Sequence, residues 1–136
     1  MIFVVDGKIR GKGRPRYSGI THTVYTPKET VAYEKQIARA YKEAGGEMFP
    51  EECEIRVTVK AYFAIPKSYS SCKKTYCMTG AMNPMKKPDI DNILKVVLDG
   101  LNGIAYSDDK NVIAVSCMKK YGQSEYLEIG VTEYKA

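Results

Sequence analysis

The segment 53–66, CEIRVTVKAYFAIP, constrains the fold more than any other part of the chain. Its apolar residues occupy every second position: Ile55, Val57, Val59, Ala61, Phe63 and Ile65. This alternation places all of them on one face of a β-strand, whereas a helix would scatter them around its axis. The chain must therefore contain a sheet with one buried face, and other elements must cover that face.

Two predicted helices supply the covering layer. Over 90–102, apolar residues recur at helical spacing and form one stripe: Ile90, Ile93, Leu94, Val97, Leu98 and Leu101. The other helix is predicted over 27–44, with Thr26 as its N-cap and Glu29 closing a capping box. Gly45 should end this helix.

The remaining periodic segments complete an α+β domain. Further strands are predicted at 2–9, 111–122 and 125–134. Segments 10–25 and 66–87 lack periodicity and are interpreted as loops. The order β-α-β-α-β-β predicts a single domain over 1–136, a mixed sheet with two main helices packed on it.

Positive charge is concentrated in two segments. The net charge is +5, and the segments 8–16 and 66–87 are rich in Lys and Arg but contain no acidic residue. Such patches favour an anionic partner, above all a nucleic acid. The candidate contacts are Lys12, Arg14, Arg16, Lys73, Lys74, Lys86 and Lys87. The alternative is that these are solvated loop charges.

Other features exclude several classes of protein. No apolar run approaches the roughly 20 residues that span a bilayer. The N-terminus places apolar residues before basic ones, the reverse of a secretory signal, so we expect a cytoplasmic protein without membrane partners. The four cysteines are then expected to be free thiols. Cys72 and Cys77 lack the spacing of a zinc site, and the single histidine, His22, is distant.

Four of the aspartates in KKPDIDNILKVVLDGLNGIAYSDDKNV, residues 86–112, form two close pairs: Asp89 with Asp91, and Asp108 with Asp109. Asp89 can cap the helix over 90–102, and Asp91 can pair with Lys95 one turn later. These ordinary roles leave Asp108 and Asp109 unexplained.

A metal site would explain all four. If the strand over 111–122 lies beside the helix over 90–102, Asp109 can approach Asp89 and Asp91, and three converging carboxylates require a cation. Oxygen ligands favour Mg²⁺, with Mn²⁺ as the alternative. A carboxylate-bound metal among basic residues is typical of phosphodiester cleavage. Lys95 could stabilise the developing charge or transfer a proton.

The same residues carry a family resemblance. KPDIDNILKVVLDGLNG…YSDDKNV resembles the RusA-type crossover-junction endonucleases of bacteria and their phages. The matching positions are Pro88, Asp89, Asp91, Asn92, Lys95, Asp99, Leu101, Asn102, Gly103, Tyr106, Asp108, Asp109 and Val112. Similar stretches at 12–34 and 61–68 extend the resemblance over nearly the whole chain. Some members carry arginine where this chain has Pro88, which leaves that basic role to Lys86 or Lys87.

The resemblance implies a homodimeric, Mg²⁺-dependent enzyme that resolves four-way (Holliday) DNA junctions by symmetric nicks in recombination and repair. It implies that Asp89, Asp91 and Asp109 bind the metal, that Asp108 contributes, and that Lys95 is catalytic. Which of Asp108 and Asp109 faces the metal stays open.

Two other functions are compatible with the residues. A non-catalytic DNA- or RNA-binding module would use the aspartates only as helix caps and surface pairs, but would have no use for Asp109 beside Asp89 and Asp91. A metal-dependent phosphoryl transferase acting on small nucleotides is less favoured, because the chain has no Walker motif.

Overall fold

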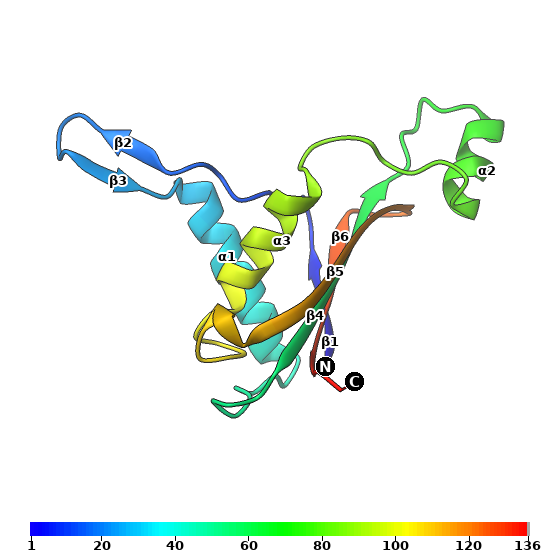
Figure 1. Cartoon of the computed structure of the whole chain (residues 1–136). Coiled ribbons are helices and arrows are strands. Elements are labelled where there is room, and N and C mark those ends of the chain that lie inside the picture. The colour runs from blue at the N-terminus through cyan, green and yellow to red at the C-terminus, as the bar shows by residue number, and fades with distance from the viewer. Residues whose placement is uncertain (136) are drawn as a thin grey trace.

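Two helices lie side by side on one face of a four-stranded sheet in the computed structural model, which describes residues 1–135 (Figure 1). The strands are β1 (Ile2–Asp6), β4 (Ile55–Ala64), β5 (Val112–Gly122) and β6 (Tyr126–Glu133), in the order β1-β6-β4-β5. The helices are α1 (Lys28–Glu43) and α3 (Ile90–Leu101). Since β4 pairs parallel with β5 and antiparallel with β6, the sheet is mixed and the predicted α+β fold is confirmed.

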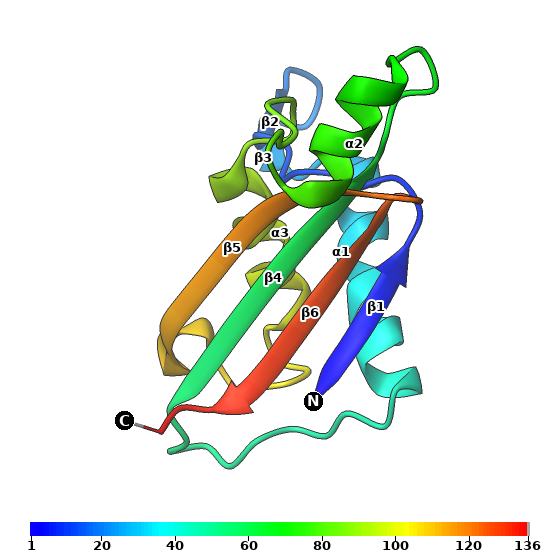
Figure 2. The same cartoon turned by 90° about the vertical axis from the view of Figure 1, so that its right-hand side faces the viewer.

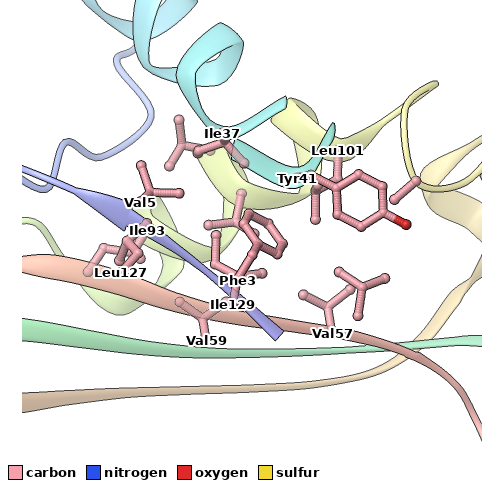
Figure 3. Close-up of a cluster of buried hydrophobic side chains, with 14 of the residues drawn as sticks. Phe3, Val5, Ile37, Tyr41, Val57, Val59, Ile93, Leu101, Leu127 and Ile129 are labelled. Carbon is pink, nitrogen blue, oxygen red and sulfur yellow. The ribbon is translucent and has the colours of Figure 1, made fainter. Parts of the chain in front are cut away.

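The buried core lies between the sheet and these helices (Figure 3). The alternating side chains of β4 point into it, and Val57, Val59 and Phe63 are at most 1% exposed. From α3, Ile93 and Leu101 are fully buried, whereas Ile90 is 44% exposed and stands outside the stripe predicted for it. Figure 2 shows the opposite, uncovered face of the sheet.

Shorter elements lie in the two segments interpreted as loops. Segment 10–25 contains an exposed hairpin of β2 (Arg16–Ser18) and β3 (Thr23–Tyr25), and segment 66–87 contains α2 (Ser71–Thr79). A 3₁₀ turn, η1 (Asp109–Asn111), precedes β5. The loop prediction was wrong for α2 because Cys77 is its sole buried residue, so no apolar stripe marks the helix.

The start of α1 differs from the prediction by one residue. Its N-cap is Pro27, and no side chain caps it, so the predicted capping by Thr26 is wrong. Thr30, in the first turn, is buried instead and accepts a hydrogen bond from the backbone N–H of Gly13 at 3.1 Å. The predicted end is confirmed, since Ala44 is the C-cap.

The helices α1 and α3 touch where α3 has a glycine. A Cβ atom on Gly100 would lie 3.1 Å from the carbonyl oxygen of Glu34 and 3.2 Å from Cβ of Ile37. A side chain here would require the neighbouring atoms to move by a few tenths of an ångström, so glycine favours this close approach.

We predict that Gly100→Leu lowers the free energy of unfolding by roughly 1–3 kcal/mol, because the added side chain must push α1 and α3 apart. Urea denaturation measures the change. Ala81→Leu, in the exposed segment after α2, is the control and should shift stability by less than about 0.5 kcal/mol. Equal stability of the two variants would contradict the close helix contact.

Candidate functional site

The basic segment 8–16, here called the strap, leaves β1 and passes between the N-terminal ends of α1 and α3. The backbone N–H of Lys12 donates to the carbonyl of Asn92 on α3 at 3.0 Å. The next residue, Gly13, is held to Thr30 of α1. The strap is therefore attached to both helices.

Two glycines make this path possible. A Cβ atom on Gly11 would lie 2.8 Å from Cβ of Pro88, and one on Gly13 would lie 2.7 Å from Oγ1 of Thr30. Both distances are shorter than normal contacts, so the glycines are needed for close approach. The neighbouring residues of the strap, such as Lys12 and Arg14, carry the side chains.

Lys12 fastens the strap with its side chain. Its Nζ lies 2.5 Å from Oε1 of Glu34 on α1 and 3.0 Å from Oδ2 of Asp99 on α3, and the side chain is only 15% exposed. Burial alone would lower the pKa of the Lys12 ammonium, but the hydrogen bonds and charges of Glu34 and Asp99 outweigh burial and raise it. We therefore assign Lys12, predicted to contact DNA, to holding the strap.

A concave, mainly basic pocket of about 830 Å³ opens beside the strap. Its charged lining residues are Lys8, Arg10, Lys12, Arg14, Arg16, Glu29, Lys87 and Asp89. The N-terminal end of α1, at Pro27, and that of α3, at Pro88 and Asn92, also line the pocket. Helix N-termini and basic side chains both favour anions, so the pocket suits a phosphate backbone. The structure thus brings Arg14, Arg16, Lys87 and Asp89 together around one pocket.

The capping role considered for Asp89 and the ion pair considered for Asp91 are not realised, although Asp91 does lie in the first turn of α3, where its charge complements the helix dipole. Asp89 occupies the N-cap position, but its side chain makes no capping hydrogen bond. Within residues 1–135, Asp91 and Lys95 form no ion pair. The side chains of Asp89, Asp91 and Lys95 are exposed, so both carboxylates are accessible to a ligand.

Asp108 and Asp109 lie at the other end of α3. Hydrogen bonding to Asp108, together with desolvation and the charges of Asp108 and Asp99, raises the pKa of Asp109. The shared hydrogen bond lowers the pKa of Asp108. Burial, assisted by the charges of Asp109 and Asp99, raises the pKa of Tyr106. The charge of Asp99, in the last turn of α3, thus acts on both Asp109 and Tyr106.

The predicted meeting of Asp109 with Asp89 and Asp91 within one chain is therefore wrong. A helix of 12 residues is about 18 Å long, and β5 runs back alongside α3, so its start lies beside the end of α3 (Figure 1). Across the described part of the chain, no three His, Cys, Asp or Glu side chains converge in a group that could hold a metal ion. A single chain does not fit the metal implied by the resemblance.

Helix α2, which carries two of the other predicted basic residues, lies on the opposite side of the N-terminus of α3 from the hairpin (Figure 1). Lys73 and Lys74 belong to α2, and Nζ of Lys73 stands 5.1 Å from the ring centre of Tyr69. Lys86 lies over the ring of Phe63 at 5.1 Å, and its carbonyl accepts a hydrogen bond from Lys119. Sequence reasoning missed Lys119, because its position in β5 gave no sign that the strand ends beside Lys86.

Two further expectations concern the class of protein. The four cysteines of the described chain are free thiols, with Cys77 buried and Cys72 exposed. No helix in residues 1–135 combines the length and the apolar character needed to cross a membrane.

Comparison with known proteins identifies relatives of the whole chain. The family model described as "Endodeoxyribonuclease RusA" matches residues 6–132. The chain is also 31% identical over 139 residues to the uncharacterized protein YqaN of Bacillus subtilis (strain 168), and the match covers 98% of this chain and 96% of YqaN. The matched region includes the strap, the pocket and all four aspartates.

We predict that Lys12→Met lowers the free energy of unfolding by roughly 1–3 kcal/mol, because Glu34 and Asp99 would be left half-buried without their cation. Thermal or urea denaturation measures the loss. Lys60→Met is the matched control: Lys60 pairs with Glu128 at 3.8 Å on the exposed sheet face, and its loss should cost less than about 1 kcal/mol. Similar losses in both variants would refute the special role of Lys12.

Proposed function

The chain belongs to the RusA endodeoxyribonuclease family, and we propose that it is a divalent-metal-dependent endonuclease that resolves four-way (Holliday) DNA junctions by paired symmetric nicks in recombination and repair. The observation that carries this proposal is the position of Asp89. Its uncapped carboxylate stands at the wall of a basic pocket, where a bound phosphate would meet it.

The pocket is the proposed binding site for the DNA backbone. Arg14 and Arg16 on the strap and Lys87 before α3 would contact phosphates, assisted by the N-terminal ends of α1 and α3. On the other side of α3, Lys73, Lys74 and Lys86 would contact a second arm of the junction (Figure 1). Phosphate contacts fix position without reading sequence, which suits an enzyme that recognises DNA shape.

We propose a homodimer because one chain holds only half of the acidic site. β5 is an edge strand, and its exposed apolar residues Ile113, Val115 and Met118 are 46–50% accessible. Asp108-Asp109 lie just before the start of β5 and Lys119-Lys120 lie near its end, so an antiparallel pair of β5 edges would match acid to base.

Such pairing would bring together carboxylates that lie at opposite ends of α3 within one chain. The end of β5 lies beside the segment preceding α3, as the contact between Lys119 and Lys86 indicates. An antiparallel partner would therefore carry its own Asp108-Asp109 to the end where Asp89 and Asp91 lie. Those residues together would suit Mg²⁺ or Mn²⁺, which would polarise the scissile phosphate and activate water.

The chain's own residues would perform the rest. Lys95 lies one turn after Asp91 on the exposed side of α3, where its ammonium could stabilise charge developing on the phosphate. A two-fold dimer has two equivalent sites, and symmetric resolution of a junction requires two nicks. Under this proposal, dimer formation is required for cleavage.

One observation favours a second candidate, a non-catalytic nucleic-acid-binding module. No group of acidic side chains able to hold a metal is assembled within residues 1–135. A binding module would contact junctions through the pocket but would not cut them in Mg²⁺.

The proposed shared site predicts complementation between inactive variants. Asp91→Asn and Asp109→Asn should each abolish cleavage, Asp91→Asn without loss of junction binding, because each removes a metal ligand. When the two variants are mixed, half of the sites in a heterodimer are doubly impaired, but the others receive Asp91 from one chain and Asp109 from the other. We expect nicking to return, limited to one nick per heterodimer, in a labelled four-way junction with Mg²⁺.

The complementation experiment separates the alternatives. A site within one chain gives no recovery in the mixture, because each chain then carries a broken site. A binding module gives no cleavage even for the wild type. Assembly is measured by light scattering. Val115→Arg on β5 should produce monomers, whereas Val4→Arg on the opposite edge strand β1 should not; the exposed fractions of the two valines are similar, at 46% and 44%.

Replacement of both Arg14 and Arg16 by alanine should weaken binding to any DNA. Two lost phosphate contacts should reduce the slope of log affinity against log salt concentration by about 1.8, at roughly 0.9 per contact. The control is Arg39→Ala with Lys42→Ala, which removes the same charge from the exposed C-terminal half of α1. If the slope changes equally in both double variants, the strap does not contribute specific phosphate contacts.

A further inference from the structure

The hairpin over residues 16–25 is not part of the core. Its strands β2 and β3 pair only with each other, and the hairpin projects beyond the helices from the edge of the molecule (Figure 1). Large apolar side chains are nevertheless exposed along it: Tyr17 at 64%, Ile20 at 94%, Val24 at 68% and Tyr25 at 48%. An isolated two-stranded hairpin with this surface is expected to have a binding partner.

The tip of the hairpin is internally braced. Oη of Tyr17 lies 2.8 Å from Nδ1 of His22, within hydrogen-bond distance, and the hydroxyls of Thr21 and Thr23 are 2.7 Å apart. The backbone N–H of Thr21 donates to Oγ of Ser18 at 3.3 Å. These bonds close the turn around Ile20, which is left pointing into solvent.

Charge selects the kind of partner. Residues 10–25 contain no Asp or Glu, and Arg14 and Arg16 at the root of the hairpin line the pocket that also contains Asp89. The hairpin is therefore a basic element with an apolar tip. A second copy of this basic surface would be repelled, whereas a polyanion with an apolar face would fit.

Branched DNA has such a face and linear duplex does not. In a continuous duplex each base pair is covered by its neighbours, but at a branch point the terminal base pairs have a neighbour that is easily displaced. Apolar and aromatic side chains that insert between such bases replace the lost stacking. The hairpin lies at the rim of the proposed binding site for the DNA backbone. One chain could therefore contact both the phosphates and the bases at the branch point.

We propose that the 16–25 hairpin recognises the branch point, with Ile20 and Tyr17 against unstacked bases and Arg14 and Arg16 on the flanking phosphates. This inference rests on the proposed function and deepens it. The pocket accounts for affinity for DNA in general, and the hairpin accounts for preference for a junction over a duplex.

The test places the fluorescent base 2-aminopurine at the branch point of a four-way junction or in the middle of one arm, in EDTA so that no cleavage occurs. Wild-type protein should increase fluorescence only at the branch point. Ile20→Ser should abolish the increase and weaken junction binding about tenfold, because stacking against a base is lost. Its affinity for linear duplex should change less than twofold. Ile20→Leu should restore the signal, and Met48→Ser, 50% exposed in the connection after α1, should match the wild type.

The possible results are distinct. If the wild type prefers the junction and Ile20→Ser retains both preference and fluorescence, the branch-recognition role of the hairpin is refuted while the nuclease proposal stands. If Ile20→Ser converts dimers to monomers in light scattering, the hairpin is a contact between copies and the inference is equally refuted. If the wild type binds junction and duplex alike, the proposed junction specificity and this inference both fail.

Discussion

The ion pairs of Lys12 join the parts of the molecule on which the site depends. One ammonium bridges Glu34 of α1 and Asp99 of α3, beside the point where Gly100 lets these helices touch. The same residue fixes the strap through its backbone N–H. The strap also carries Arg14 and Arg16, which line the basic pocket. The ion pairs of Lys12 therefore help to set the geometry of the pocket, even if Lys12 itself does not contact a bound ligand.

Local sequence patterns predicted most of the fold. The alternation in β4 and the stripe on α3 come from burial on one face, and burial leaves a periodic trace in the sequence. α2 and the hairpin leave no such trace, because α2 buries only Cys77 and the hairpin strands are almost entirely exposed. Their formation is determined by local bonds, such as the cap that Ser70 provides to Lys73 of α2.

The sequence nominated residues for the candidate site but could not give their arrangement in space. Helical spacing places Asp91 and Lys95 one turn apart on the same side of α3, and both side chains are exposed. Lys12 could not be separated from the neighbouring strap residues, because only the tertiary packing of α1 and α3 places Glu34 and Asp99 around it. The position of Asp109 depends on the direction of β5 relative to α3, which residue spacing does not encode.

The separation of the aspartates has a physical consequence for activity. Hydrogen bonding between Asp108 and Asp109 already raises the pKa of Asp109 and lowers that of Asp108, and further carboxylates beside them in one chain would repel each other without a cation. Dividing the proposed metal ligands between the two ends of α3 avoids that repulsion in the monomer. If the ligands meet only across two chains, a lone subunit bound to DNA has no complete site and cannot leave a single unmatched nick. Cutting then requires the same two-fold assembly that matches the symmetry of the substrate.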